Sequence, residues 1–278
     1  MYSVSFLNKF MRGPHKWRLK SGMKIHYIRH GKYILTAVIA VVAVMAIYTL
    51  GSLSRQYGEA VNAVAPKLPI YCTDDDTMRV GLTINCAWGA EDIPEILDIL
   101  DRAEIQATFF VLGVWAEKNP EMLKQIYERG HEIGNHSYSH KLPSKSTAKQ
   151  LGEEIDKCND AVESILGIRP NLYRAPSGDH TDTLLDLVES KGMYAIKWSV
   201  DSIDWRDDMT ASDIISRVTG RTTSGSILLF HNDTKHTVSV LPEIISHLQG
   251  EGYRFVKISE LIYKDHYRID NQGMQCGQ

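Results

Sequence analysis

Between residues 79 and 262 the sequence alternates short apolar runs with longer amphipathic runs, and this alternation restricts the fold more than any other feature. The run at 107–112, ATFFVL, is apolar without a break, which is typical of a strand buried on both faces. A longer run begins with a Thr147/Gln150 capping box, has its apolar residues at helical spacing and ends at Gly167. Strands that alternate with helices in this way pair in parallel, so the predicted class is α/β.

The same two patterns repeat along the rest of this region. Further strands are predicted at 80–84, 132–135, 172–174, 195–200, 227–230 and 253–258. Further helices are predicted after Asp92, which is expected to cap the first of them, after Pro120, and at 183–191, 212–218 and 241–250. Residues 263–278 are polar and are expected to form a frayed tail.

Polar side chains stand at or just past the C-terminal ends of five predicted strands: Asn85, His136, Arg174, Asp201 and His231. Convergence from so many strands is typical of the mouth of a parallel barrel. An open nucleotide-binding sheet is the alternative, but no Gly-x-Gly-x-x-Gly or Walker sequence follows any strand. The sequence therefore predicts a parallel (β/α) barrel with its site at the C-terminal ends of the strands.

The N-terminal region predicts a membrane anchor. Residues 33–50 form an uncharged, mostly apolar run, which as a helix would span roughly 27 Å, close to the hydrocarbon thickness of a bilayer. Eight Lys or Arg residues and no acidic residue precede it, which places the N-terminus in the cytoplasm and the body outside. A cleavable signal peptide ending at Ala63-Val-Ala65 is the less favoured alternative, because this sequence lies well past the apolar run.

The predicted organisation is a basic cytoplasmic segment at 1–32, a single-pass transmembrane signal anchor at 33–51, a linker at 52–78, one folded domain at 79–262 and the polar tail at 263–278. With eight of the 31 basic residues in the first segment, the remainder carries 23 against 34 acidic residues. An acidic body argues against nucleic acid as a partner, because phosphate binding requires a cationic surface. The four cysteines show no paired spacing, and no disulfide is predicted.

His136 and His140 are the first candidate metal ligands. Four residues apart, two imidazoles fall on one side of a helical turn and can meet one divalent ion. A catalytic metal normally has a third protein ligand as well, and two surface or helix-capping histidines would show the same spacing. This pair alone is therefore a weak signal.

Five motifs, taken together and in order, carry a resemblance to a known family. They are Thr83-Ile-Asn-Cys-Ala-Trp-Gly89, His136-Ser-Tyr-Ser-His140, Arg174-Ala-Pro-Ser-Gly178, Asp201-Ser-Ile-Asp-Trp205 and Leu228-Leu-Phe-His231. Over residues 79–262 the chain resembles the polysaccharide deacetylases, the nodulation-type domain of carbohydrate esterase family 4. The Ala-Trp-Gly turn and the Phe-His-Asn232 ending look most like the sporulation-associated bacterial branch. The resemblance implies a distorted (β/α) barrel that removes acetyl groups from N-acetylated cell-wall or related glycans with a divalent metal, usually zinc.

Position by position, the resemblance implies roles for the residues of these motifs. His136 and His140 would bind the metal, and His231 would be the general acid that protonates the leaving amine. Arg174 would orient the catalytic base, and Asp201 would hold His231, although a turn cap is an alternative role for Asp201. The substrate would meet the backbone N–H of Ser177, which stabilises the oxyanion, and an acetyl pocket lined by Trp205 and Leu229.

The first motif departs from the family pattern. The family normally has Thr-Phe-Asp-Asp-Gly, in which the first Asp is the base and the second is the third metal ligand, and here these positions are Asn85 and Cys86. An amide cannot take a proton from water at neutral pH. Cys86 could bind zinc as a thiolate or could pack in the core. Glu91 and Asp92 are the nearest acids in the sequence that could replace the base.

Two functions follow from this balance. The first is a membrane-anchored deacetylase that acts outside the cytoplasmic membrane on N-acetylated glycan. The second is a catalytically impaired relative that binds glycan or a partner protein through the same cleft. The histidines, Arg174 and Asp201 favour the first function, and Asn85 favours the second.

Overall fold

The computed structural model describes residues 38–52 and 67–278 of the chain. Residues 1–64 and 65–278 form separate units, and each is described by itself. In the first unit, residues 38–52 form a helix with exposed apolar side chains. Within the described ranges, no helix combines the length and apolar character needed to cross a bilayer. The predicted anchor at 33–51 begins outside these ranges, as does the basic segment 1–32, so both stay predictions.

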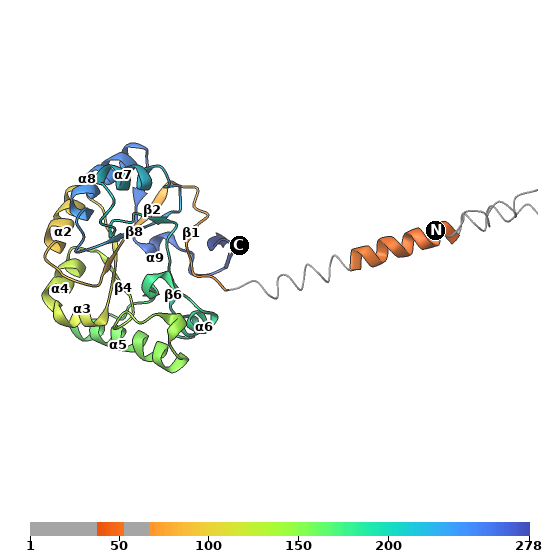
Figure 1. The fold of residues 1–278 in the computed structure, drawn as a ribbon, viewed down its shortest axis with the longest axis horizontal. Coiled ribbons are helices and arrows are strands. Elements are labelled where there is room, and N and C mark those ends of the chain that lie inside the picture. The colour runs from red at the N-terminus through yellow and green to blue at the C-terminus, as the bar shows by residue number, and fades with distance from the viewer. Residues whose placement is uncertain (1–37, 53–66) are drawn as a thin grey trace, which may run out of the picture. The chain divides into compact units, whose positions relative to one another are not determined.

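The second unit is built on a parallel sheet that curves into an incomplete barrel (Figure 1). Strand β2 (Arg79–Cys86) lies in its interior, between β3 and β8. On one side follow β3 (Thr108–Val111), β4 (Glu132–Asn135), β5 (Leu172–Tyr173) and β6 (Tyr194–Ala195). On the other side lie β8 (Ile227–His231) and β7 (Val200–Asp201), and β9 (Arg254–Phe255) pairs with the start of β2. The predicted parallel α/β class is confirmed, as a distorted half-barrel.

The strand predicted at 195–200 is in fact two strands on opposite edges of the sheet. β6 pairs with β5, β7 pairs with β8, and residues 196–199 cross the opening between them. In this crossing the Lys197 N–H donates to the Ile70 carbonyl, and Ile70 forms a parallel bridge with Ile196. The pattern that predicted a single strand therefore runs through a change of partner strand, which no local pattern records.

Two boundary predictions are wrong. The predicted linker 52–78 and tail 263–278 each contribute to a second sheet, in the order β1 (Cys72–Thr73), β11 (Met274–Gly277), β10 (Tyr267–Ile269). These segments have no apolar period, and backbone pairing together with hydrogen bonds of buried polar groups attaches them to the domain. The buried Gln275 side chain, for example, accepts from the Tyr263 N–H and donates to the Tyr263 carbonyl. Residues 53–66 lie outside the described ranges.

Helices surround the sheet (Figure 1). They are α2 (Ile93–Arg102), α3 (Gly113–Lys118), α4 (Pro120–Glu128), α5 (Ala148–Leu166), α6 (Asp182–Ser190), α7 (Ala211–Thr219), α8 (Thr237–Gly250) and α9 (Ile258–Leu261). The Thr147/Gln150 capping box and the left-handed Gly167 at the ends of α5 are confirmed. Asp92 precedes α2 but makes no side-chain cap, so that prediction is wrong.

Strand alternation separates the core from the site. Along β2, Leu82, Ile84 and Cys86 pack in the main apolar core with the surrounding helices. Thr83 and Asn85 lie between them in sequence and therefore face the inside of the barrel. A second cluster, which includes Phe110, Ile227 and residues of α9, fills part of that interior. The polar residues that follow the strands are thus collected at the C-terminal edge of the sheet.

His131, at the opposite end of β4, predicts a pH-dependent stability. It is 2% exposed, its Nδ1 accepts from the Ala107 N–H, and its Nε2 has no partner. Burial lowers the pKa of His131 to about 4. The unfolded chain therefore binds one more proton between pH 4 and about 6.5, so folding stability falls as the pH falls through this window, by about 3 kcal/mol in total.

Urea unfolding of the full chain at pH 7.5 and pH 4.5, followed by tryptophan fluorescence, measures this loss. His131→Gln keeps an acceptor for Ala107 but cannot titrate, and it should lose less stability on acidification than the wild type. Equal losses in the two proteins would contradict the assignment.

Candidate active site

Four strand ends bring the candidate residues together. Asn85 on β2 lies in register beside His231 on β8. His136 follows β4, and its N–H donates to the Val111 carbonyl of β3. Arg174 follows β5, and its N–H donates to the Asn135 carbonyl of β4. These contacts place the four residues at one edge of the sheet, as the sequence predicts.

His136 and His140 lie in ring contact, with centroids 5.2 Å apart in an edge-on arrangement. The segment between them is not the predicted helical turn. It is a loop in which Ser137 and His140 adopt positive φ angles of 75° and 62°. The two rings therefore meet because of loop geometry and not because of helical spacing.

Glu154 of α5 accepts hydrogen bonds from this loop and stabilises its conformation. Its carboxylate accepts from the Ser137 hydroxyl at 2.8 Å, the Ser139 N–H at 2.7 Å and the Lys141 ammonium at 2.9 Å. Burial alone would raise the pKa of Glu154, but these donors outweigh it and lower the pKa to about 2. Glu154 is therefore ionised at neutral pH and holds the turn that joins the two histidines.

The histidine pair fits two positions of a divalent metal site. Burial lowers the pKa of His136 well below its usual value, and burial together with the charge of His231 lowers that of His140, so both imidazoles are neutral as ligands require. His136 Nδ1 lies 2.9 Å from the Arg174 carbonyl, which assigns the proton to Nδ1 and leaves Nε2 as the donor to a metal. Within the described ranges, no group of three or more His, Cys, Asp or Glu residues is arranged to hold a metal.

Cys86 does not complete that site. Its side chain is buried in the main core, on the face of β2 opposite to Asn85. Burial raises the pKa of the Cys86 thiol well above its usual value, which disfavours the thiolate that zinc binds. The structure favours the packing alternative for this residue.

Arg174 lies where a catalytic base would need orientation, and it contacts Asn85. Its Nη1 donates to Asn85 Oδ1 at 3.1 Å and to the Thr83 hydroxyl at 2.7 Å, and its Nη2 donates to the Lys197 carbonyl. The guanidinium is fully buried and stacks over the Phe110 ring at 4.0 Å. All three acceptors are neutral, and burial lowers the pKa of Arg174 to about 9. The arrangement that would orient a carboxylate is therefore present, with an amide in its place.

His231 is held by Asp204 and not by Asp201, which corrects the prediction. The Asp204 carboxylate lies 2.8 Å from His231 Nδ1 and also accepts from the His231 N–H. Thr237 donates to the same carboxylate at 2.6 Å, and Asp204 is buried. His231, the predicted general acid, therefore has a fixed ring orientation and a buried carboxylate as its partner.

Asp201 shapes the turn that carries Asp204. Its carboxylate accepts from the Ile203 N–H at 2.8 Å, and Ile203 has a positive φ of 55°, which is strained for a β-branched residue. Its charge also raises the pKa of Arg174, in opposition to the larger effect of burial. The turn-cap alternative is the one that the structure supports for Asp201.

The three predicted substrate-binding residues lie in different environments. Ser177 is exposed and left-handed, with φ 55°, in the short helical turn Pro176–Gly178 after β5. Leu229 is buried on β8, in register with Thr83 on β2 and Asp201 on β7. Trp205 is 54% exposed and lines an open cleft together with Trp88 and Asp204.

Neither of the two acids considered as replacement bases faces the histidine pair. Glu91 is exposed, and its carboxylate accepts from the Ala90 N–H. Asp92 accepts from the Asp233 N–H at 2.7 Å and from the Asn232 side chain at 3.4 Å. Both carboxylates are therefore engaged in the loops around the site.

Three residues of the site region were missed in the sequence. Asp204 stands in the quoted motif Asp201-Ser-Ile-Asp-Trp205, so the motif contained the signal but did not say which acid meets His231. Glu154 lies in the middle of a helix pattern, and Trp88 in a turn, where neither has a sequence signal for its contacts. Trp88 stands 6.2 Å from the His231 ring.

The geometry agrees with comparisons with known proteins. The polysaccharide deacetylase family model matches residues 70–196. The chain is 36% identical over 194 residues to the uncharacterised protein YlxY of Bacillus subtilis. This match covers 70% of the chain and 60% of YlxY. It is 35% identical over 178 residues to a peptidoglycan-N-acetylglucosamine deacetylase of Bacillus cereus, covering 62% of the chain and 83% of that protein.

Solved structures show the same relationship. The wild-type structure of BA3943, described as a CE4 family pseudoenzyme from Bacillus anthracis, superposes with a TM-score of 0.68 at 32% identity, over 77% of this chain and 74% of that one. A mutant of BA3943, described as having restored enzymatic activity, superposes with a TM-score of 0.67 at 33% identity, over 73% and 72%. From the fold, the arrangement of the site and these similarities, the chain belongs to the polysaccharide deacetylase family, carbohydrate esterase family 4.

Proposed function

We propose that this protein binds N-acetylated cell-wall glycan at the C-terminal mouth of its barrel and lacks efficient deacetylation. The observation that carries the proposal is the contact of Arg174 with the Asn85 amide, where the family has a catalytic carboxylate. An amide at this position can accept hydrogen bonds but cannot take a proton from water. The histidine pair and the His231–Asp204 pair remain available to contact a sugar and its acetamido group.

A slow, metal-dependent deacetylase is the second candidate. The observation that favours it is the intact His231–Asp204 pair, because a histidine held by a buried carboxylate is suited to protonate a leaving amine. A divalent ion, with zinc as the proposed metal, would be held by His136 and His140 and would polarise the acetyl carbonyl. The sporulation-associated branch stays part of this proposal and rests on the Ala87-Trp88-Gly89 turn.

One experiment separates the two candidates. Calorimetry would measure binding of N-acetylglucosamine oligomers to the full chain with and without Zn²⁺, and an acetate assay would follow the same samples. The proposal expects binding without acetate release above the level of a heat-denatured control. Zinc-dependent acetate release would support the second candidate instead, and absence of binding would contradict both.

Metal binding gives a separate prediction. Because two ligands and no third converge among residues 67–278, we expect Zn²⁺ to bind the full chain more weakly than it binds relatives with an Asp at the position of Cys86. His136→Ala and His140→Ala should each abolish this binding in calorimetry, whereas the exposed His247→Ala on α8 should leave it unchanged. Unchanged affinity in both site variants would show that the ion binds elsewhere.

We also propose that residues 33–51 anchor the protein in the cytoplasmic membrane with its glycan site outside. The support is the uncharged apolar run and the eight basic residues before it. Membrane fractionation is expected to recover the protein in the pellet after alkaline extraction. External protease should degrade the domain in cells whose wall has been removed, and full protection would contradict the orientation.

A further inference from the structure

The C-terminal sheet ends in a strand whose outer edge is unpaired. In the order β1-β11-β10, strand β10 (Tyr267–Ile269) has β11 on one side only. The Asp270 N–H donates to the Met274 carbonyl of β11, so the backbone groups of even-numbered residues face β11. Those of Tyr267 and Ile269 point away from it and have no hydrogen-bond partner within residues 67–278. Such an edge is a template for another strand.

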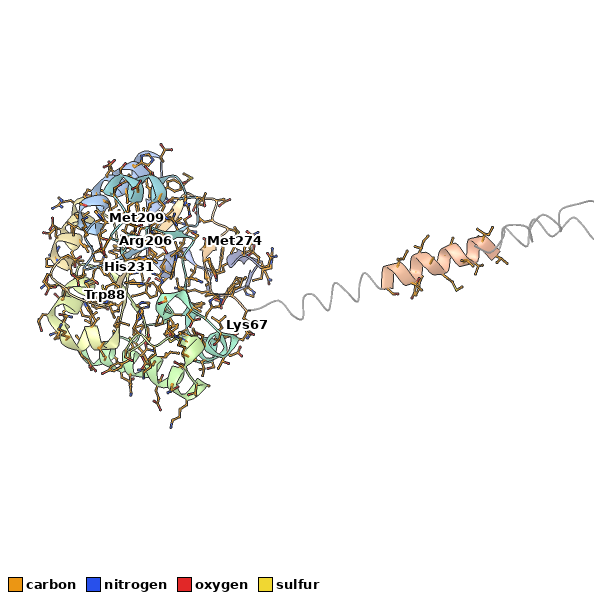
Figure 2. The ribbon with its side chains drawn as sticks, in the orientation of Figure 1. Lys67, Trp88, Arg206, Met209, His231 and Met274 are labelled. Atoms are coloured by element: carbon orange, nitrogen blue, oxygen red, sulfur yellow. The ribbon has the colours of Figure 1, made fainter. Side chains whose placement is uncertain are left out.

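A groove of about 420 Å³ runs beside this edge, between β10 and the pair formed by α6 and β6. Leu185 and Val188 of α6 contribute to its apolar lining. Figure 2 labels Lys67, which lines the groove, and Met274 of β11, and both lie on the side of the domain away from Trp88. The edge and its groove are therefore remote from the candidate active site.

The two faces of β10 differ in character. Tyr267 and Ile269 are half-buried, and Ile269 packs against the second apolar cluster of the domain. Arg268, between them, is exposed, and its guanidinium has no ion pair within the part of the chain that the structure describes. Asp270 Oδ1 accepts from two backbone N–H groups of its own turn, whereas Oδ2 has no partner among the same residues. The outer face therefore presents a cation and a carboxylate oxygen two residues apart.

These charges select one register for a second copy of the strand. Two identical strands related by a two-fold axis pair antiparallel. An axis through Arg268 would place two arginines directly opposite each other, which is unfavourable. An axis through Tyr267 would place Arg268 opposite His266. An axis through Ile269 places each Arg268 opposite the partner's Asp270, in the closely spaced positions of a non-hydrogen-bonded pair.

We propose that β10 pairs with β10 of a second copy of this chain across a two-fold axis at Ile269. Ile269 exchanges two backbone hydrogen bonds with the partner's Ile269, and Arg268 forms an ion pair with the partner's Asp270 on each side of the axis. Tyr267 and Ile269 of both copies lie on the face that borders the grooves, where they bury apolar surface. Because β10 has three residues, the contact is small and the dimer is weak.

Sedimentation velocity on the full chain in detergent, at concentrations from about 1 to 200 µM, tests the proposal. The wild type is expected to shift from monomer to dimer across this range. Arg268→Asp places a carboxylate opposite the partner's Asp270 and should weaken association about tenfold, whereas Arg268→Lys keeps the charge and should retain most of it. Arg221→Asp, the same change at an exposed residue after α7, is the matched control and should associate like the wild type.

A charge exchange separates strand pairing from a loss of folded protein. Asp270→Arg places like charges opposite each other and should also weaken self-association. A mixture of Arg268→Asp and Asp270→Arg restores both ion pairs, so it should form mixed dimers with the affinity of the wild type, observed with one variant labelled by a fluorophore. Melting temperatures report on the turn that Asp270 caps.

Three results would overturn the proposal. They are a wild type that stays monomeric over the whole range, association that Arg268→Asp leaves unchanged, and a mixture of two folded variants that associates no better than either alone. If Asp270→Arg does not fold, the comparison of Arg268→Asp with Arg268→Lys decides, because both keep the turn intact.

Discussion

Asn85→Asp is expected to raise the rate of acetate release from an N-acetylglucosamine oligomer by about 10²- to 10⁴-fold, the usual range for general-base catalysis. The substitution replaces one amide with a carboxylate of nearly the same shape at the C-terminal end of β2. Arg174 Nη1 already lies 3.1 Å from Asn85 Oδ1, so a carboxylate there would have a charged partner that holds its orientation. His231 and Asp204 are in place to protonate the leaving amine. The measurement is the initial rate of acetate release at saturating Zn²⁺.

Controls decide whether the gain comes from the base. Asn85→Ala removes the amide without adding a carboxylate and should show no gain. The double variant Asn85→Asp/Arg174→Lys keeps a positive charge but loses the fork of donors, so it should lose much of the gain. If the wild type is already as fast as Asn85→Asp, position 85 is not the base, and Glu91→Gln and Asp92→Asn become the variants to assay. If neither protein releases acetate while both bind glycan, the site is a binding site only.

Asp204→Asn, made in the Asn85→Asp protein, is expected to lower kcat by about 10²- to 10⁴-fold with little change in KM. The Asp204 carboxylate accepts from His231 at Nδ1, which fixes the ring and leaves Nε2 as the nitrogen that can deliver a proton. An asparagine can place its NH₂ group toward Nδ1, which favours the wrong tautomer and disturbs proton delivery. Asp204 also accepts from Thr237 and from the His231 N–H, so its loss changes the position of the acid as well as its charge.

Asp201→Asn in the same background is the matched control. Asn can still accept from the Ile203 N–H, and the carboxylate hydrogen-bonded to His231 is that of Asp204, so the kcat of this variant should fall far less. Equal losses of kcat in the two variants would contradict the assignment of Asp204 as the partner. Melting temperatures of both proteins show whether a loss of kcat reflects a loss of folded protein.

The sequence could predict those site residues that directly follow a recognisable strand. His136, His140, Arg174 and His231 each follow a strand whose apolar pattern is visible, and parallel strands bring their C-terminal ends to one edge. Cys86 was also within reach of the sequence, because neighbours on a strand point to opposite faces and Asn85 was already assigned to the site. The sequence could not show which acid is hydrogen-bonded to His231. Asp201 and Asp204 lie in the same motif, and the strained turn at Ile203 decides which of the two carboxylates reaches the ring.

By itself the sequence determined the alternation of strands and helices in the main sheet, the parallel class of that sheet and the end of it at which the site lies. These properties follow from side-chain periodicity and from the chirality of crossover connections, which act over a few residues or a single strand–helix–strand unit. Only the tertiary structure decided the division of 195–200 between two edges and the pairing of β1 with β11. It also decided the Asp204–His231 contact and the meeting of Trp88 and Trp205 at one cleft. Each of these depends on which distant segments become neighbours, and that is set by the packing of the whole barrel and not by any local pattern.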